Sequence, residues 1–310
     1  MKKYLLLGGN GYIGRYLAER IAMENEVVVA DKNIEKCGKC GNIEYKNIDF
    51  INCNNFDEYL CDIDVVIHLI STIFPNDNLE NIEKDITENV FPTLRLLRDI
   101  CKKKDTKIIF LSSGGTVYGE HNRVPIKENE IKMPICNYGI IKENIEKYLE
   151  LYSNYMNLNY RVIRLSNPYS EKIKNGRKQG IIPIVIDQII NGDIIKIYGD
   201  GNEVRDYIYI DDAIDAIMEI INYGGEEKVF NVGTGKGYSI NELLELITED
   251  LKDYKVNIEH LDNRKCDVSY NILDITCINK ETGWYPKISL EQGIKKVINE
   301  KLKEEDELYA

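Results

Sequence analysis

The sequence predicts an α/β protein built on a doubly wound parallel sheet, with a smaller, interleaved C-terminal α/β lobe. Three observations support this fold class. Short apolar runs alternate with segments of helical apolar spacing through the first half of the chain. A glycine-rich turn follows the first apolar run, where such folds bind ligands at the carboxyl ends of their strands. Beyond Pro168 the alternation gives way to short elements separated by turns rich in Gly, Asn and Lys.

The apolar runs have the length of strands that are buried on both faces of a sheet. They lie at residues 4–7, 27–30, 64–69, 108–111 and 160–165, and a further strand is expected at 43–48. Between them, apolar residues three and four apart predict helices at 12–23, 82–103 and 138–151. Because strands that alternate with helices are joined by right-handed crossovers, the sheet should be parallel, with helices on both faces.

The turn after the first strand has the layout of a dinucleotide-binding site. Gly8, Gly11 and Gly14 fall three apart, and Asp31 ends the second strand 17 positions after the last of them. Residues without a Cβ allow a tight turn and a close approach of the backbone, and the N–H groups that open the next helix hold a pyrophosphate. The acid accepts hydrogen bonds from a ribose diol and repels a 2′-phosphate, which favours NAD over NADP. The alternative is a glycine-rich turn in some other α/β domain.

These motifs divide the chain into two predicted parts. We expect residues 1–166 to form the NAD-binding domain, with a later segment at about 206–233 returning to it. Residues 167–310 would mainly form the second lobe. No Pro/Ser-rich linker separates the two, so they should be interleaved. After residue 167 we expect short elements at 181–190 and 194–198, and helices at 211–221, 242–251 and 289–302.

Composition excludes several classes of function. The chain has 310 residues, 43% of them hydrophobic, which is ample for a large core. Forty Lys and Arg residues against 52 Asp and Glu give a net charge of −12, so we expect no nucleic-acid partner. No apolar run approaches the ~20 residues that a membrane span needs. The apolar piece at 4–7 is too short for the core of a signal peptide.

The cysteines point to a reducing compartment. Eight of them are scattered without the spacing of a disulfide framework, which indicates a cytoplasmic protein. Cys37 and Cys40 resemble half of a zinc ribbon, but no second close Cys or Cys/His pair follows. We therefore expect a surface loop at these residues and no metal site.

Tyr138 and Lys142 are the candidate reactive pair. They lie four apart at the start of a predicted helix, so they share one face of it. A tyrosine is a useful proton donor and acceptor when the pKa of its phenol is lowered, and a neighbouring ammonium and the positive charge of a bound nicotinamide both favour the phenolate. A chance Tyr-x-x-x-Lys in a chain rich in both residues is the alternative. A dinucleotide fingerprint and a serine-rich strand end upstream favour the functional interpretation.

His68 ends the strand predicted at 64–69. No other nearby residue supplies a partner for metal binding or base catalysis. We therefore interpret it as a packed or hydrogen-bonded residue rather than a ligand or base.

Six motifs, taken in order, carry a resemblance to a known family. The chain resembles the extended short-chain dehydrogenase/reductases, which have the Rossmann fold, and within them the NAD-dependent sugar-nucleotide epimerases of the UDP-glucose 4-epimerase type. The match runs from residue 3 to about the last helix. The motifs are Gly8-Gly-Asn-Gly-Tyr-Ile-Gly14, Asp31, Ser112-Ser-Gly-Gly-Thr-Val-Tyr-Gly119, Tyr138-Gly-Ile-Ile-Lys142, Arg164-Leu-Ser-Asn-Pro168 and Arg205-Asp-Tyr-Ile-Tyr-Ile-Asp-Asp212.

The resemblance implies a tightly held NAD that is reduced and reoxidised within one turnover. Tyr138 would take the proton of the sugar 4-hydroxyl as hydride leaves C4, and hydride would return to the other face of the 4-keto sugar. Lys142 would lower the pKa of the phenol and hold the nicotinamide ribose. The cofactor contacts that the resemblance implies are Gly8, Gly11, Tyr12, Ile13, Gly14, Asp31, Asn33, Asp49, Phe50, Leu69, Ser112, Tyr138 and Lys142.

The resemblance also implies a set of nucleotide-sugar contacts in the second lobe, which would make it the substrate lobe. Asn167 matches a residue that contacts the substrate diphosphate. Arg205 and Arg264 match the arginines that grip it, as a fork of fixed donors suits phosphate oxygens, and Asp267 matches an acid beside the second arginine. Tyr198, just before a Gly-Asp-Gly turn, is a candidate to stack on the base. Each charged residue has the alternative of an ordinary surface position.

One departure from the family pattern concerns the sugar 4-oxygen. The family usually has Ser or Thr as the third residue after the fifth strand, and this chain has Gly114 there. Ser113 or Thr116 could supply the hydroxyl, with Ser113 slightly favoured. The dehydratase branch places an Asp-Glu pair at the positions of Gly115 and Thr116, and its absence here argues against 4,6-dehydration.

The predicted function is epimerisation of a nucleotide sugar, a UDP-hexose at C4 above others. The alternatives on the same scaffold are a uronate epimerase, a 2-epimerase, a reductase or a decarboxylase. An NAD-binding protein without catalysis is the alternative from another class. We also expect a homodimer through the helices at 82–103 and 138–151, with packing against their own sheet as the other explanation of their apolar residues.

Overall fold

The protein was analysed as a computed structural model. It describes residues 1–34, 42–75, 81–103, 105–121, 123–171, 180–264 and 267–309. Cys37 and Cys40 lie outside the described residues. Within the described part, no helix combines the length and apolar character required to cross a bilayer. No group of three or more His, Cys, Asp or Glu side chains there could hold a metal ion.

Seven strands form the central sheet, in the order β11-β6-β5-β4-β1-β2-β3. β1 pairs in parallel with both β2 and β4, so the strand order reverses beside β1. This confirms the predicted doubly wound sheet. The strands are β1 Lys3–Leu7, β2 Glu26–Asp31, β3 Ile43–Asn47, β4 Val65–His68, β5 Lys107–Ser113, β6 Asn159–Leu165 and β11 Val229–Val232.

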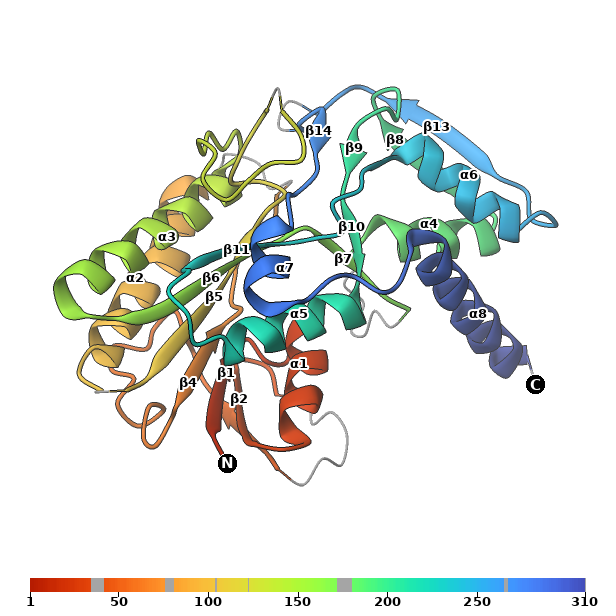
Figure 1. Ribbon diagram of the computed structural model, residues 1–310. Coiled ribbons are helices and arrows are strands. Elements are labelled where there is room, and N and C mark those ends of the chain that lie inside the picture. Colours follow the sequence, from red (N-terminus) through yellow and green to blue (C-terminus); the bar gives the residue numbers. More distant parts are fainter. Residues whose placement is uncertain are drawn as a thin grey trace. The chain divides into compact units, whose positions relative to one another are not determined.

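Helices cover this sheet. α1 (Tyr12–Ala22) follows β1, and α2 (Ile82–Ile100) and α3 (Asn137–Met156) pack side by side (Figure 1). α3 ends at Asn157, which adopts the left-handed conformation (φ +57°) and donates its N–H to the Ser153 carbonyl. The sequence predicted an end near residue 151, because the last turns of this helix carry exposed side chains that leave no apolar period to read.

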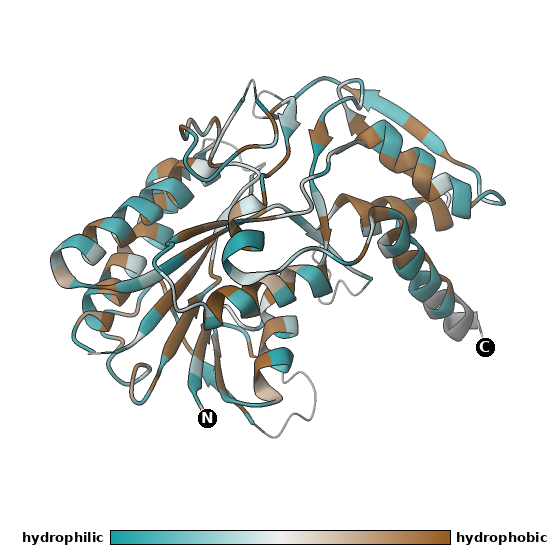
Figure 2. Ribbon diagram, viewed as in Figure 1, coloured by the Kyte–Doolittle hydropathy of each residue, from teal (hydrophilic) through white to brown (hydrophobic). Residues whose placement is uncertain are grey.

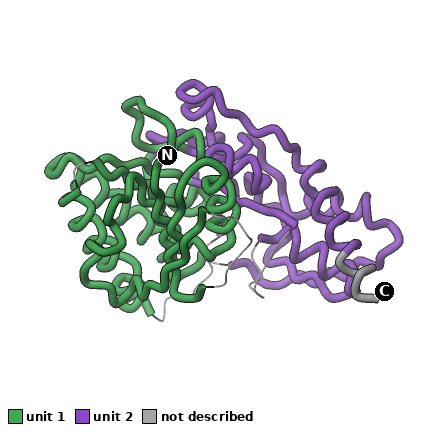
Figure 3. The backbone as a smooth tube through the Cα atoms, turned by 90° about the horizontal axis from the view of Figure 1, so that it is seen from below, with its two compact units in different colours: residues 1–119, 131–164, 217–230 green, residues 120–130, 165–216, 231–310 purple. Residues whose placement is uncertain are grey.

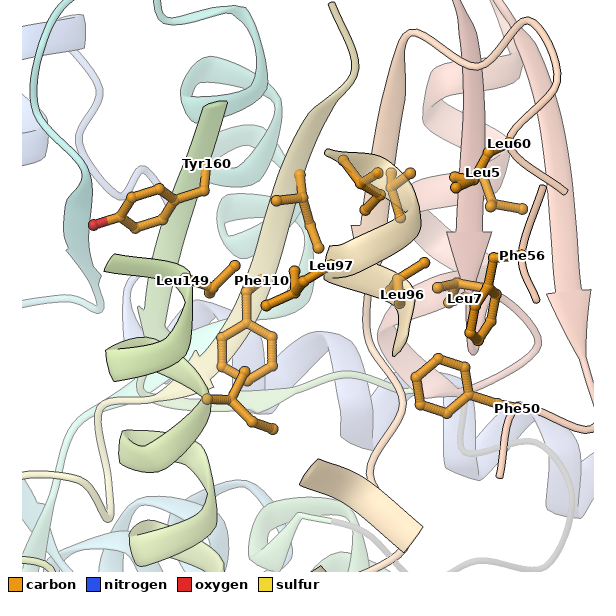
Figure 4. Packing of buried hydrophobic residues seen from close by; sticks show 14 of the residues in the cluster. Leu5, Leu7, Phe50, Phe56, Leu60, Leu96, Leu97, Phe110, Leu149 and Tyr160 are labelled. Atoms are coloured by element: carbon orange, nitrogen blue, oxygen red, sulfur yellow. The ribbon is translucent and has the colours of Figure 1, made fainter. Parts of the chain in front are cut away.

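Alternate residues of each strand point to opposite faces of the sheet. Leu5 and Leu7 of β1 join a core cluster with Leu96 and Leu97 of α2 and Leu149 of α3 (Figure 4). The strands of the central sheet are coloured predominantly as hydrophobic, whereas the helices alternate between hydrophobic and hydrophilic residues (Figure 2). The pattern is that of strands buried on both sides and helices buried on one.

Two compact units are interleaved along the chain (Figure 3). Unit 1 comprises residues 1–119, 131–164 and 217–230. Unit 2 comprises residues 120–130, 165–216 and 231–310. The chain crosses between them several times, which explains the lack of a linker in the sequence.

Unit 2 contains three small sheets. β7 pairs with β10, β8 with β13, and β9 lies between β12 and β14. α5 (Ile210–Asn222) contributes to both units. The remaining elements are β7 Asn167–Tyr169, α4 Ile181–Ile190, β8 Ile194–Tyr198, β9 Val204–Arg205, β10 Tyr207–Tyr209, β12 Tyr238–Ser239, α6 Ile240–Asp250, β13 Asn257–Leu261, β14 Tyr270–Asn271, α7 Thr276–Thr282 and α8 Leu290–Tyr309.

Candidate functional site

The glycine turn in unit 1 brings backbone atoms unusually close together. Gly8 has φ +81°, a conformation that strains other residues, and its N–H donates to the Ala30 carbonyl on β2 (2.9 Å). A Cβ added at Gly14 would lie 2.6 Å from the Cα of Gly9, so α1 begins directly against the turn. A Cβ at Gly11 would lie 3.1 Å from the Gly8 carbonyl oxygen. A cradle that only glycine can form, open to helix N–H groups, fits a pyrophosphate.

Asp31 holds the other side of this turn. Its Oδ2 accepts the N–H of Asn10 (3.2 Å), and its Oδ1 accepts the N–H of Asn33 (3.3 Å). The Asn10 side-chain amide donates in turn to the Asn33 carbonyl (2.6 Å). A carboxylate has about four acceptor positions, so both oxygens of Asp31 can still receive ribose hydroxyls. The two hydrogen bonds from the backbone N–H groups of Asn10 and Asn33 hold the Asp31 carboxylate in place for this contact.

The other cofactor candidates of unit 1 differ in location and exposure. Tyr12 and Ile13 open the first turn of α1, and the Leu69 N–H donates to the Leu7 carbonyl beside the glycine turn (2.9 Å). Asp49 is exposed, and its hydrogen bond from the Asn52 side chain (2.8 Å) lowers its pKa.

Phe50 is unlike these residues, because its side chain belongs to the core. It is buried, with its ring centroid 5.5 Å from that of Phe56 and 5.1 Å from that of His68. A cofactor could therefore be contacted only by its backbone.

The candidate reactive pair lies on the first turns of α3. The Lys142 ammonium donates to the Leu111 carbonyl on β5 (2.9 Å) and lies 5.5 Å from the centroid of the Tyr138 ring. It also lies 4.8 Å from the centroid of the Phe110 ring. Two contacts to β5 therefore fix the ammonium beside the phenol.

Burial moves the two pKa values apart. It raises the pKa of the Tyr138 phenol, and the Cys136 thiol adds to the effect. It lowers the pKa of Lys142 to about 8, although the negative charge of Glu146 opposes this shift. The sequence led us to expect that the ammonium would help to lower the pKa of the phenol, but among the protein's own groups burial dominates. A lowered phenol pKa would therefore need the nicotinamide charge.

Three hydroxyl groups lie at or just after the end of β5, and their surroundings differ. The Ser112 hydroxyl is buried and donates to the Glu146 carboxylate (2.5 Å). The Thr116 Oγ1 is shielded from solvent and has no hydrogen-bond partner among the described residues. The Ser113 side chain is half-buried. Thr116 is half-buried as a residue too, so the two candidates for the sugar 4-oxygen differ in that the Thr116 hydroxyl itself is shielded from solvent.

His68 is a core residue, as predicted. It is 1% exposed, and its Nε2 lies 2.9 Å from the Thr93 Oγ1. The Thr93 hydroxyl itself donates to the Asn89 carbonyl (2.6 Å), so the imidazole must donate through Nε2. Burial, helped by the charge of Lys142, lowers the pKa of His68 to about 3. The ring is neutral across the physiological range.

Glu146 is a buried charged residue that the sequence analysis did not single out. It lies one helical turn beyond Lys142, and its carboxylate pairs with Lys132 (3.0 Å) and Arg164 (2.8 Å) as well as with Ser112. Burial would raise its pKa, but the hydrogen bond and charge of Arg164 lead the groups that together lower it. The four-residue spacing places Glu146 on the face of α3 that carries Lys142, but it does not show that the carboxylate is buried.

Asp206 organises the candidate phosphate contacts of unit 2. Its backbone carbonyl accepts the N–H (3.1 Å) and the side-chain amide (2.9 Å) of Asn167. Its buried carboxylate accepts the N–H groups of Thr234 (2.8 Å) and Gly235 (3.1 Å). Asn167 is thus fixed by a residue for which the sequence analysis assigned no role, and Arg205 directly precedes that residue in the chain.

The remaining candidates of unit 2 form two pairs. The Arg205 guanidinium lies 3.5 Å from the Asp267 carboxylate, which makes an ion pair within the predicted set. The Arg264 guanidinium carbon lies 3.5 Å from the centroid of the Tyr198 ring and covers its face. The face predicted to stack on a base is therefore in contact with the arginine predicted to grip the diphosphate.

Comparison with known proteins shows the family of the chain. A family model described as the NAD-dependent epimerase/dehydratase family matches residues 4–233. The chain belongs to this family. A putative UDP-glucose 4-epimerase of Methanocaldococcus jannaschii is 34% identical to it over 95% of this chain and 97% of the relative.

Two further relatives of the chain are a reductase and a 4-epimerase. A dTDP-4-dehydro-6-deoxyglucose reductase of Escherichia coli is also 34% identical, over 95% of this chain and 96% of the relative. The crystal structure of a UDP-glucose 4-epimerase from Thermotoga maritima, with UDP-glucose, superposes with a TM-score of 0.89. It is 31% identical and covers 97% of this chain and 99% of that one. The cofactor is NAD, as the sequence predicted, and the glycine turn with Asp31 fits it.

Proposed function

We propose that this enzyme epimerises a nucleotide-activated sugar, with a UDP-hexose as substrate and C4 as the reacting carbon. The observation that carries the proposal is the Tyr138–Lys142 pair fixed against β5, with a half-buried Ser113 hydroxyl at the end of the same strand. One phenol, one ammonium and one hydroxyl are the protein groups that a reversible oxidation of an alcohol needs. The matched epimerases of Methanocaldococcus jannaschii and Thermotoga maritima support the same assignment.

In this proposal Tyr138 is the acid and base. Its phenolate oxygen takes the proton of the 4-hydroxyl as the C4–H bond breaks, and gives the proton back when that bond re-forms on the opposite face. NAD, when bound, accepts the hydride from C4 and returns it. The Lys142 ammonium stabilises the phenolate and holds the nicotinamide ribose. Ser113 donates the hydrogen bond to the sugar 4-oxygen that Gly114, which has no hydroxyl, cannot donate.

Unit 2 would hold the nucleotide. We assign Asn167, Arg205 and Arg264 to the diphosphate and Tyr198 to the base, with Asp267 orienting Arg205 through their ion pair. Unit 1 would hold NAD through the glycine turn, Asp31 and the other contacts implied by the family pattern. The division into a cofactor unit and a nucleotide-sugar unit is part of the proposal.

The second candidate is a reductase that acts on a 4-keto nucleotide sugar. The Escherichia coli relative, which is as similar as the archaeal epimerase, favours it specifically. The same phenol would then donate its proton to the carbonyl oxygen while C4 receives hydride, and the reduced cofactor would be consumed. Uronate epimerase and decarboxylase activities remain alternatives, since relatives with those names also match. An NAD-binding protein without catalysis is disfavoured by the presence of both Tyr138 and Lys142.

The test is to incubate the purified protein with UDP-, GDP-, CDP- and dTDP-sugars and to identify products by NMR. We expect a pair of C4 epimers from one UDP-hexose without added NADH. Conversion of a 4-keto sugar with equimolar NADH consumption, and no epimer formation, would establish the reductase instead. Tyr138→Phe should retain bound NAD and lose nearly all turnover. Turnover near that of the wild type in this variant would remove Tyr138 from the mechanism.

We also propose a cytoplasmic homodimer. Cys53, Cys61 and Cys101 carry free thiols, which suits a reducing compartment. α2 and α3 each expose large apolar side chains although both already pack on the sheet. These are Ile82, Ile86 and Phe91 on α2, and Ile140, Leu151, Tyr155 and Met156 on α3.

A further inference from the structure

Glu146 joins the elements that surround the reactive pair. It receives hydrogen bonds from Ser112 at the end of β5 (2.5 Å) and from Arg164 at the end of β6 (2.8 Å), and Lys132 reaches it from the segment before α3 (3.0 Å). Its side chain is 4% exposed, as is that of Arg164. Arg164 also donates to the Tyr118 hydroxyl (2.7 Å). A buried carboxylate with this many donors is stable only while all of them remain in place.

The network is connected to Lys142 in two ways. Lys142 and Glu146 lie four apart on α3, so they share a face of the helix. Lys142 donates to the carbonyl of Leu111, and the next residue, Ser112, donates to Glu146. The same two elements, α3 and β5, are therefore bonded twice, once through the ammonium and once through the carboxylate.

Charge is the second part of the argument. Lys142 lies beside the neutral His68 ring of β4 and the Tyr138 phenol of α3, neither of which carries a negative charge to balance its ammonium. The cations Arg164 of β6 and Lys132 both pair with Glu146. Among the causes that shift the Lys142 pKa, burial lowers it to about 8 and the Glu146 charge opposes that change. Glu143 lies 3.8 Å from Lys132 and partly offsets that cation. Glu146 is thus the anion through which the site retains a protonated lysine near neutral pH.

We propose that Glu146 is a positioning residue for the Tyr138–Lys142 pair: it fastens α3 to the ends of β5 and β6 and supplies the counter-charge of the Lys142 ammonium. The proposal rests on the proposed function, in which a protonated Lys142 stabilises the phenolate. It assigns no contact with substrate to Glu146. In this proposal Ser112 and Arg164 both hold the Glu146 carboxylate in the position from which it acts on Lys142.

The test compares two substitutions with opposite expected signs. In the NAD-loaded protein labelled with ¹³C at lysine Cε, the Lys142 resonance is identified as the one lost in Lys142→Met and is titrated by NMR. Glu146→Gln removes the counter-charge, so we expect the Lys142 midpoint to fall by about one pH unit. Lys132→Met removes a cation that pairs with Glu146 and neutralises part of its charge. More of that charge then acts on Lys142, so the Lys142 midpoint should rise. For the active enzyme, Glu146→Gln should lower kcat about fivefold near pH 8, less at lower pH, with KM unchanged.

Asp99→Asn is the matched control. Asp99 is likewise a buried carboxylate of unit 1, held by Arg98 (3.0 Å) and Lys102 (2.7 Å), but it lies on α2 rather than beside the pair. Its removal should reduce stability and leave the Lys142 midpoint in place. An unchanged midpoint in Glu146→Gln, or shifts of the same sign in Glu146→Gln and Lys132→Met, would overturn the proposal. If Glu146→Gln does not fold, Lys132→Met alone decides. The proposal is then overturned if the Lys142 midpoint does not rise in Lys132→Met. The titration uses no substrate, so its outcome is separate from whether the protein is an epimerase.

Discussion

At the scale of single residues, burial favours the uncharged forms of both Tyr138 and Lys142. The same loss of solvent that raises the pKa of the phenol lowers that of the ammonium. The phenol therefore holds its proton more tightly, and the ammonium holds its proton less tightly. Lys142 keeps its place through the Leu111 carbonyl and its charge through Glu146. The protein alone does not create a phenolate, and a positively charged cofactor ring would supply the missing stabilisation. Proton removal would thereby depend on bound oxidised cofactor.

The role of Ser113 gives a prediction at this scale. Ser113→Ala should lower kcat about tenfold or more, because one charge-assisted hydrogen bond to the sugar 4-oxygen is lost. Thr116→Val should cost much less, since its Oγ1 is shielded from solvent. The measurement is the initial rate of product formation by NMR in each variant.

A second substitution makes the assignment sharper. Gly114→Ser restores a hydroxyl at the position where the family usually carries one. In the Ser113→Ala background it should recover much of the lost rate. If Thr116→Val is the more damaging variant and Gly114→Ser gives no recovery, the hydroxyl comes from Thr116 or from elsewhere.

Part of the geometry of this candidate site was predictable from the sequence, for reasons that can be named. Gly8, Gly14 and Asp31 are constrained by backbone geometry and charge, and both constraints are visible as spacing. Glu146 and Asp206 were not anticipated because their partners are far away in the chain: Asp206 is bonded to residues 28 and 29 positions distant. A buried carboxylate cannot be distinguished from a surface one until the donors around it are known.

At the scale of elements, the long helices and buried strands were predictable and the short strands of unit 2 were not. Inner strands of the central sheet such as β1 and β4 are largely apolar, since both of their faces are covered. The edge strand β3 is partly exposed and mixes polar with apolar residues. β9, β12 and β14 have two residues each, which is too few to show a period of two. Their pairing depends on tertiary contacts such as the carboxylate of Asp206. The loosened pattern beyond Pro168 is the signature of such elements.

The junction between β1 and α1 gives a prediction at this scale. A Cβ at Gly14 would lie 2.6 Å from the Gly9 Cα and 2.7 Å from the Gly8 carbonyl oxygen, so backbone must move to admit it. Gly14→Ala should therefore lose its bound NAD and destabilise the protein by about 1–3 kcal/mol. NAD released on denaturation and the free energy of unfolding measure the two effects.

Gly224→Ala is the control for that substitution. A Cβ at Gly224 would meet nothing within 4 Å, and the residue belongs to the same unit. It should leave both NAD content and stability close to those of the wild type. Full NAD content in Gly14→Ala would show that the close approach of α1 to the turn is not needed for binding.

At the scale of the whole molecule, Asp99 predicts how stability depends on pH. Burial alone would raise its pKa, but Arg98, Lys102 and the Phe56 N–H together hold it at about 2, below the ordinary value of 3.8. Because the folded state binds this proton less tightly than the unfolded state, the contribution is full above about pH 4 and is lost as the pH falls towards 2. Asp99→Asn should cost about 2 kcal/mol at neutral pH, and less to the extent that solvent screens the half-exposed cations.

Urea unfolding of the wild type and of Asp99→Asn at several pH values checks this. The difference in the free energy of unfolding should shrink steadily between about pH 4 and pH 2. A difference that does not change across that range would mean that the ionisation of Asp99 is not what stabilises the loop around Phe56.

The exposed apolar residues of α2 and α3 give the last prediction. Phe91 and Ile140 are each 51% exposed, and Tyr155 is 79% exposed, although both helices already bury another face against the sheet. A second copy of the chain is the partner that would cover these residues, because a symmetric interface formed by α2 and α3 of both copies buries the same patch twice. The double variant Phe91→Glu/Ile140→Glu should therefore be monomeric at concentrations where the wild type has twice the chain mass of 35.8 kDa, as measured by light scattering. Met23→Glu, at a position that is 70% exposed at the end of α1, should stay dimeric with the wild type. A monomeric wild type would refute the dimer, and a dimeric double variant would place the interface on another surface.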